Sequence, residues 1–263
     1  MSLFSIDDVP ALRANNLFLV AQQYLSNFQP TDQYLLGQLL AAEAEIGRRL
    51  RVALQPTTIF PYPPSDSDIA ALPAGMLWAE EPAYDYDPNF FTGNSWGYIV
   101  TRQRPIIGVN WIRFAYPAPT TGFFTIPQDW LRIDKKYGQI RLVPASAAFT
   151  APLGAFLMQA IGAGDMIPGM IQVNYVTGLT DARNNWPDVI SIIFRVAALK
   201  VVQDSFVASS GSISADGLSQ SFAMKLSDYE DSIDRVLFGP KGSNGGLKTA
   251  IHGVMAQAAG ASG

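Results

Sequence analysis

The stretch that decides the fold runs from Ile171 to Val202 and reads IQVNYVTGLTDARNNWPDVISIIFRVAALKVV. Its first residues alternate between apolar and polar side chains, which is typical of a strand with one buried face. Gly178 supplies the turn that ends this strand. Pro187 favours the first turn of a helix, because its missing amide hydrogen would have no partner there. The sequence therefore predicts a strand, a glycine turn and a helix over 188–207.

The predicted helix 188–207 is apolar on nearly every side. Its apolar residues are Val189, Ile190, Ile192, Ile193, Phe194, Val196, Leu199, Val201 and Val202. Such a helix is buried on more than one side. It therefore lies either at the centre of a core or at a contact between subunits. Its apolar run contains Arg195 and is shorter than the roughly 20 residues that cross a bilayer, so we expect no membrane contact.

A second long helix is predicted over 31–52. Thr31 is a good N-cap, and Asp32 in the first turn complements the helix dipole. Apolar residues recur at helical spacing: Leu35, Leu39, Ala42, Ile46 and Leu50. Three cations suit the negative end of the helix: Arg48, Arg49 and Arg51. Further helices are expected within 1–29 and over 223–238.

Strand patterns fill the middle of the chain. Residues 106–116 change their apolar phase at Trp111-Ile112, which indicates a bulge. Residues 130–134 and 139–143 form a predicted hairpin whose apolar side chains share one face: Leu131, Ile133, Ile140 and Leu142. We therefore expect an α+β fold in which long helices pack around a small antiparallel β-sheet, with long extended insertions.

Two segments interrupt these elements. Residues 55–104 are rich in proline and aromatic residues, which predicts an extended arm that packs against something. Residues 144–170 form an Ala/Gly-rich insertion, and 209–221 reads as a Ser/Gly loop. The domain organisation expected is a core of 1–54 and 105–238, an arm of 55–104, an insertion of 144–170 and a C-terminal tail of 239–263.

The chain carries few charges. They make up 15% of its residues, against roughly 25% in ordinary soluble domains. Such a surface is easiest to explain if partners cover much of it, although an ordinary neutral polar surface is the alternative. The net charge of −4 argues against general nucleic-acid binding. The absence of cysteine excludes disulfides, thiolate metal sites and a cysteine nucleophile.

No residue pattern points to catalysis or to a cofactor. The single histidine, His252, lies in the tail, where an imidazole would be exposed or at an interface rather than rigidly oriented for a catalytic triad. Asp85–Asn89 begins like a calcium loop, but Phe90 and Trp96 stand where that loop needs glycine and glutamate. We therefore expect no metal.

Gly242–Thr249 has the glycines of a phosphate-binding loop, but Leu247 separates the last glycine from Lys248. Acidic residues at helical spacing near the C-terminus are read as a solvated helix face: Asp228, Glu230, Asp231 and Asp234. We expect no enzymatic activity and no cofactor.

The order of the elements resembles that of the head–tail connector (adaptor) proteins of tailed bacteriophages. The matching segments are the helix Thr31–Arg49, the strand Pro105–Ile107, the hairpin Ile133–Ile140, the strand and turn Val173–Gly178, the pair Trp186-Pro187, and the loop Ser214–Ser221. The resemblance covers 31–52 and 105–234, and it lies in the order of these segments.

The resemblance implies a structural virion protein. Such a protein forms a ring, commonly of twelve copies, in the virion neck after assembly in the host cytoplasm. The ring binds the portal protein on one side and a stopper or tail-completion protein on the other. DNA passes through its lumen.

Two sets of contact residues follow. The arm and the apolar helix are the expected subunit interface, through Trp78, Tyr84, Tyr86, Phe90, Phe91, Trp96, Ile192, Phe194 and Arg195. The tail is the expected portal contact, through Lys241, Leu247, Lys248, Ile251, His252, Val254 and Met255. The alternatives are a tail-terminator or other capsid- or neck-associated protein, and an enzyme acting on carbohydrate, which would need two carboxylates across a cleft.

Overall fold

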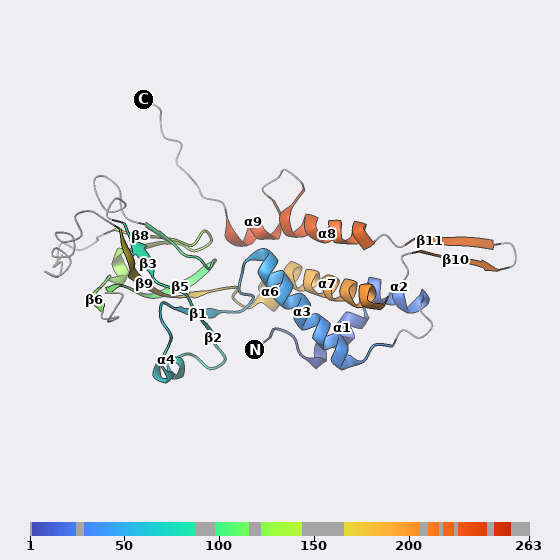
Figure 1. The fold of residues 1–263 in the computed structure, drawn as a ribbon, viewed down its shortest axis with the longest axis horizontal. Coiled ribbons are helices and arrows are strands. Elements are labelled where there is room, and N and C mark those ends of the chain that lie inside the picture. Colours follow the sequence, from blue (N-terminus) through green and yellow to red (C-terminus); the bar gives the residue numbers. More distant parts are fainter. Residues whose placement is uncertain are drawn as a thin grey trace, which may run out of the picture. The chain divides into compact units, whose positions relative to one another are not determined.

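A computed structural model describes residues 2–24, 29–87, 98–115, 122–143, 166–205, 210–215, 218–223, 226–240 and 245–253. The chain divides into two compact units. Unit 1 comprises Met1–Arg51 and Asp181–Ile251, and unit 2 comprises Val52–Thr180 and His252–Gly263. Unit 1 holds the long helices and unit 2 holds two of the three sheets (Figure 1). The α+β class is thus confirmed.

The expected division into domains differs from these units. The expected core of 1–54 and 105–238 is split between them, because helices and strands separate into different units. The elements of unit 1 are η1 (Ile6–Asp8), α1 (Val9–Arg13), α2 (Asn16–Tyr24), α3 (Asp32–Leu50), α6 (Ala182–Asn185), α7 (Pro187–Ser205), β10 (Ser210–Ala215), β11 (Leu218–Ala223), α8 (Leu226–Phe238) and α9 (Gly246–His252), whose last residue belongs to unit 2.

Helix α3 forms as its sequence predicts. The Thr31 hydroxyl accepts a hydrogen bond from the amide of Tyr34 at 3.3 Å and caps the N-terminus. The predicted apolar stripe is fully buried: Leu35, Leu39, Ala42, Ile46 and Leu50. Arg51 ends the helix in the left-handed conformation, with φ at 56°.

Helix α7 is the centre of unit 1. It begins at Pro187, one residue before the predicted start at 188, and packs against α1, α2, α3, α6 and α8. Its buried residues lie on several sides of the helix: Val189, Ile192, Ile193, Val196, Ala197, Ala198, Leu199, Val201 and Val202. The sequence left open whether this helix lies at the centre of a core or at a contact between subunits. In the structure it lies at the centre of the core of unit 1.

The strands of unit 2 form two sheets. Their bounds are β1 (Thr57–Phe60), β2 (Leu77–Glu80), β3 (Tyr84–Tyr86), β4 (Tyr98–Val100), β5 (Ile106–Ala115), β6 (Gly122–Thr125), β7 (Leu131–Asp134), β8 (Gln139–Leu142) and β9 (Ile167–Thr177), with helix α4 (Asp66–Ala70) and the turn η3 (Gln128–Trp130) between strands. The larger sheet has the order β2-β1-β9-β5-β6, with β3 also paired to β9. The smaller sheet has the order β4-β8-β7.

The described part of segment 55–104 is not a free arm. Strand β1 is buried along its whole length and pairs antiparallel with β9. Strand β2 then pairs with β1 in parallel, which α4 makes possible as the crossover between them. The sheet is therefore mixed and six-stranded, not small and antiparallel as expected. The prolines lie mainly in the connections, where they do not interrupt a ladder.

The central strand pair follows the prediction. Strands β5 and β9 pair antiparallel, and the register shifts between Val109 and Trp111, next to the predicted bulge. The β7–β8 hairpin pairs Leu131 with Leu142 and Ile133 with Ile140. Gly178 ends β9 at φ +108°, and a Cβ there would come within 2.3 Å of the Gln55 carbonyl oxygen. Glycine is therefore required at this turn.

The two sheets of unit 2 share one core. A single buried cluster contains Ile59 of β1, Ile99 of β4, Leu131 of β7 and Ile140 of β8. Successive side chains of a strand point to opposite faces. The residues next to these core positions therefore point to the opposite face of each sheet. On β1 these residues are also buried, whereas Tyr98, Arg132 and Arg141 of the smaller sheet are exposed.

Other predicted segments have mixed outcomes. The expected loop at 209–221 is instead a hairpin, in which Ser210–Ala215 pairs antiparallel with Leu218–Ala223. The sequence Asp216-Gly217 between two alternating segments favours such a hairpin. Insertion residues 144–165 lie outside the described part of the chain. Among the described residues, no helix is long and apolar enough to cross a membrane.

Candidate functional site

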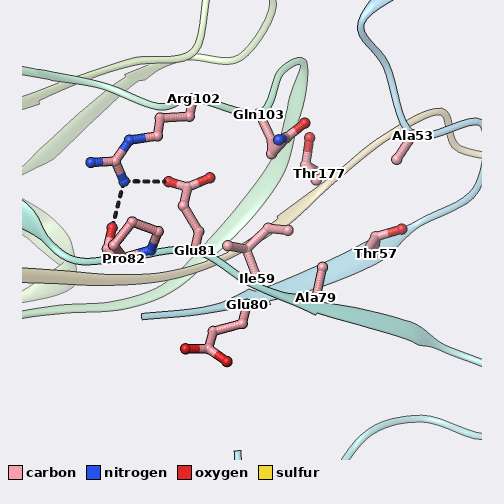
Figure 2. Close-up of a pocket in the computed structure, with 10 residues that line it drawn as sticks. All are labelled: Ala53, Thr57, Ile59, Ala79, Glu80, Glu81, Pro82, Arg102, Gln103 and Thr177. Atoms are coloured by element: carbon pink, nitrogen blue, oxygen red, sulfur yellow. Dashed lines mark hydrogen bonds and ion pairs between the residues drawn. The ribbon is translucent and has the colours of Figure 1, made fainter. Parts of the chain in front are cut away.

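An open hollow of about 410 Å³ lies in unit 2, between strands β1 and β2 and the segment that follows β4 (Figure 2). Its lining residues are Ala53, Thr57, Ile59, Ala79, Glu80, Glu81, Pro82, Arg102, Gln103 and Thr177. Glu81 is the most notable of them, because a carboxylate only 5% exposed requires partners.

Those partners come from three separate segments. The Tyr84 hydroxyl donates to one oxygen of Glu81, and the Tyr175 hydroxyl donates to the other at 2.9 Å. The Arg102 guanidinium donates to Glu81 at 3.3 Å and to the Pro82 carbonyl. The amides of Arg102 and Gln103 in turn donate to the hydroxyls of Tyr84 and Tyr175. We call Glu81, Tyr84, Arg102 and Tyr175 the Glu81 network.

The tyrosines of this network act as donors. Burial raises the pKa of the Tyr84 hydroxyl, and the hydrogen bond to the Glu81 carboxylate raises it further. Burial also raises the pKa of Tyr175, and the nearby Tyr84 and Glu81 add to this shift. Both hydroxyls therefore stay protonated at neutral pH and do not serve as nucleophiles or bases.

The hollow does not hold the carboxylate pair that glycoside hydrolysis requires. Glu80 and Glu81 are neighbours in sequence, and Figure 2 shows their side chains pointing to opposite sides of the strand. The carboxylate of Glu81 is already engaged by donors of the same unit. The Glu81 network therefore serves to hold β9, the end of β2 and the 101–104 segment together.

A second, smaller hollow of about 210 Å³ lies in unit 1 among α3, α7 and α8. Its charged groups also bond to one another. Glu45 pairs with Lys200 at 2.9 Å and with Arg49 at 3.6 Å, and Arg49 pairs with Asp234. These ion pairs link α3 to both α7 and α8.

The predicted interface residues of segment 55–104 lie in different environments. Trp78 is 45% exposed on the edge strand β2. Tyr84 belongs to the Glu81 network, and Tyr86 packs edge-on against Phe114 at 5.9 Å. Of these three, Trp78 is exposed, whereas Tyr84 and Tyr86 are partly buried. Phe90, Phe91 and Trp96 lie outside the described residues.

The predicted interface residues of α7 belong to unit 1 itself. Ile192 is 2% exposed, so its assignment to a subunit interface is wrong, because the core of unit 1 already covers it. Phe194 meets the ring of Phe4 edge-on at 5.4 Å. Arg195 lies over the ring of Tyr229 at 5.1 Å and donates to Ser232.

The predicted tail residues are partly folded. Leu247, Ile251 and His252 are buried in α9, so the expectation of an exposed or interfacial imidazole is not met. Lys248 lies 5.6 Å from the centroid of the Phe238 ring. Lys241, Val254 and Met255 lie outside the described residues.

One feature of unit 2 escaped the sequence predictions, namely the separation of its charges along the chain. Residues 52–97 contain six acidic residues and no lysine or arginine. Residues 98–143 contain seven basic and two acidic residues, a net charge of +5. The net charge of the whole chain hides this polarity. A count of charge by segment would have found it.

The structure places these charges on two different outer faces. Tyr98 and Arg141 are cross-strand partners, as are Arg141 and Arg132, and all three are exposed. They point outward because their neighbours Ile99, Leu131 and Ile140 point into the core. We call this row of Tyr98, Arg132 and Arg141 the basic face; it covers the smaller sheet.

The opposite face carries acidic groups. Trp78 and Glu80 alternate along β2 with Ala79, the register partner of the core residue Ile59, so they point away from the core. Asp66 and Asp68 lie on α4, the helix that connects β1 to β2. In Figure 1, α4 and β8 lie at different sides of unit 2. We call Asp66, Asp68, Trp78 and Glu80 the acidic face.

No protein-family model and no curated protein matches this chain. The relation to connector proteins therefore stays a prediction from the sequence.

Proposed function

We propose that this protein is a head–tail connector (adaptor) of a tailed bacteriophage. In this proposal it has a structural role and no catalytic one. Copies of the chain assemble into a ring, commonly of twelve, beneath the portal in the virion neck. A stopper or tail-completion protein binds the far side of the ring, and DNA passes through the lumen.

The observation that carries the proposal is the order of the elements. The connector resemblance depends on a capped first helix, a strand, a hairpin, a strand ending in a glycine turn, and a helix that begins at Trp-Pro. These segments fold as α3, β5, β7–β8, β9 with Gly178, and α7 with Pro187 at its start. The elements that the resemblance expects in these segments are thus the ones that form, in the order that the sequence sets.

The polar groups of the two hollows support the same proposal. Within the hollows, Glu81 pairs with Arg102 and Glu45 pairs with Lys200, each inside its own unit. Such groups stabilise the fold. Unit 2 also carries exposed charged groups that form no ion pair with a described residue, and an assembly partner could reach them there.

Imaging tests the proposal directly. The purified full-length chain is mixed with the portal protein of the same phage and examined by negative-stain electron microscopy. We expect ring-shaped density on one end of the portal. No ring, either alone or on the portal, contradicts the proposal. Density at the far end of the tail, in a map of the intact virion, assigns the chain to the tail-terminator alternative.

The C-terminal residues offer a second test. Deletion of the whole tail 239–263 would remove the buried Leu247 and Ile251, so it should disturb the fold. Truncation after Gly253 retains α9 and removes only 254–263. If the end of the chain docks onto the portal, this truncation abolishes portal capture in a pull-down while the thermal melting of the chain is unchanged. Undiminished capture refutes the docking role.

A further inference from the structure

We propose that unit 2 carries both halves of the contact between subunits. The acidic face of one copy, formed by Asp66, Asp68, Trp78 and Glu80, binds the basic face of the next copy, formed by Tyr98, Arg132 and Arg141. This inference names the surfaces that join the subunits of the ring, and in that respect it rests on the proposed function.

The basic face is difficult to explain by the stability of unit 2. Arg132 and Arg141 lie directly opposite each other on β7 and β8, and like charges in that position destabilise a sheet. Among the described residues, neither forms an ion pair. Arg132 donates to the carbonyls of Asp129 and Leu131, which neutralise no charge. Tyr98 beside them is 40% exposed. An acidic partner would remove the repulsion.

The acidic face has the complementary composition. Glu80 and Asp66 are exposed and form no ion pair with any described residue. Trp78 adds a large exposed ring two residues from Glu80. The cation of this face, Arg113, is half-buried over the ring of Trp111 at 4.3 Å and bonded to Gln172. An arginine of a partner could therefore meet both a carboxylate and an indole face, a combination that favours guanidinium.

The partner that fits is a second copy of this chain. The two faces lie on the outer sides of two sheets that share one core, so a copy cannot bring its own faces together. Two copies can, and the contact then uses a different surface on each. A heterologous contact of this kind repeats from copy to copy and closes into a ring where the rotation allows.

Nucleic acid fits the basic face less well. Proteins that bind duplex DNA commonly make about 6–10 phosphate contacts. The basic face offers two arginines on a chain of net charge −4. The exposed Lys135 and Lys136 in the turn between β7 and β8 add charge nearby, but not on the row itself.

Charge reversal with complementation tests the contact. Full-length wild-type chain, Glu80→Arg and Arg141→Glu are each examined by sedimentation velocity, and then the two variants are mixed in equal amounts. Arg48→Glu, an exposed reversal in unit 1, controls for the change in net charge. Thermal melting confirms that each variant is folded. A fluorescent 20-base-pair DNA duplex is the probe for nucleic-acid binding.

We expect the wild type to form species larger than a dimer, and to dissociate when salt rises from about 0.05 M to about 0.5 M. Each reversal alone should weaken association about tenfold or more, because like charges then meet. The mixture should restore association, since every contact again joins opposite charges. Arg48→Glu should behave as the wild type.

Several results would overturn the contact: a wild type that stays monomeric, single reversals without effect, or no recovery in the mixture. Loss of duplex binding in Arg141→Glu with unchanged association would assign the basic face to nucleic acid. Rings on the portal that ignore both reversals would refute this contact and leave the connector function standing. Charge-dependent association that stops at a dimer, with no ring on the portal, would support this contact between copies and contradict the connector function.

Discussion

In unit 1, several cations at the helix surfaces meet carboxylates of the same unit, as Arg13 meets Asp32 and Lys200 meets Glu45. In unit 2, Arg102 and Glu81 form the one ion pair among the described residues, while Arg132 and Arg141 face each other across two strands. Both units bury apolar side chains, unit 1 mainly with helices and unit 2 mainly with strands. They differ in whether their charged side chains pair with opposite charges of the same unit.

That difference separates two roles for a charged residue. A pair such as Arg183 and Asp8 links segments far apart in sequence and contributes to the stability of unit 1. A row of like charges opposes the stability of unit 2 and is useful only if a partner covers it. Substitutions in the two units should therefore differ in sign as well as in size.

The largest effect is expected where unit 2 has internal pairing. In Glu81→Ala the hydroxyls of Tyr84 and Tyr175 lose their common acceptor while still buried. We expect a loss of about 2–4 kcal/mol in the free energy of unfolding, because unsatisfied buried polar groups are costly. Urea unfolding monitored by tryptophan fluorescence measures it. Glu80→Ala at the neighbouring position is the matched control, since Glu80 is exposed. An equal loss in both variants would contradict the role given to the Glu81 network.

A smaller loss is expected from Arg183→Ala in unit 1. Arg183 donates to both carboxylate oxygens of Asp8, at 3.0 and 2.7 Å, and to the Leu3 carbonyl. Its side chain is 45% exposed, so we expect about 1–2 kcal/mol rather than the cost of a buried pair.

The same variant has a pH signature. The hydrogen bond from Arg183 lowers the pKa of Asp8 below its ordinary value of 3.8. A lowered pKa contributes stability above pH 3.8 that is lost as the pH falls through the folded-state value. Acid unfolding of the wild type should therefore include this loss, and Arg183→Ala should not show it. An unchanged acid limb in the variant would contradict the pairing.

Much of the fold could be predicted from local pattern. The stripe from Leu35 to Leu50 and the facing pairs of the β7–β8 hairpin needed only periodicity, and Gly178 needed only turn chemistry. The position of residues 57–60 inside a sheet could not be predicted from local pattern. Proline on either side of a four-residue strand resembles an irregular arm, and the pairing of β1 with β9 joins residues more than a hundred positions apart.

The candidate contact surfaces were harder to predict. Aromatic density drew attention to Tyr84 and Tyr86, which the structure uses inside unit 2, and apolar density drew it to Ile192. A buried residue and an interface residue share a composition, so only tertiary structure separates them. Arg132 and Arg141 are nine residues apart in sequence, and their opposition appears only once the hairpin register is known.

Glu43 sharpens the comparison, because it is a half-buried carboxylate of unit 1 that forms no ion pair with a described residue. The Oε1 atom of Glu43 accepts a hydrogen bond from the Leu3 amide at 3.0 Å. Its buried Oε2 atom has no hydrogen-bond partner among the described residues. Burial raises its pKa above the ordinary value of 4.5, so the folded chain favours the neutral carboxyl. Glu43→Gln should therefore raise stability at pH 7, by about 0.5–1 kcal/mol.

The sign of this gain sets its pH dependence. Below pH 4.5 the carboxyl of Glu43 is protonated in both the folded and the unfolded chain, so its raised pKa does not lower the free energy of unfolding. The loss of stability appears as the pH rises through the folded-state pKa. Thermal melts of wild type and Glu43→Gln should thus coincide at pH 4 and separate toward pH 7. The opposite trend would show that the carboxylate is stabilised by a charge within the fold.

The smallest change carries the most specific expectation. Arg141→Thr removes one of two like charges that face each other, and threonine suits a strand. We expect the free energy of unfolding of the dissociated chain to rise by about 0.2–0.5 kcal/mol, measured in urea at a protein concentration below that of association. Arg132→Thr is the matched control. It relieves the same repulsion but loses the hydrogen bonds to the carbonyls of Asp129 and Leu131, so its gain should be smaller or absent. A residue whose removal stabilises the separate chain while weakening assembly serves a partner rather than its own fold. If Arg141→Thr instead lowered stability as Arg183→Ala does, the charges of unit 2 would serve the fold just as those of unit 1 do.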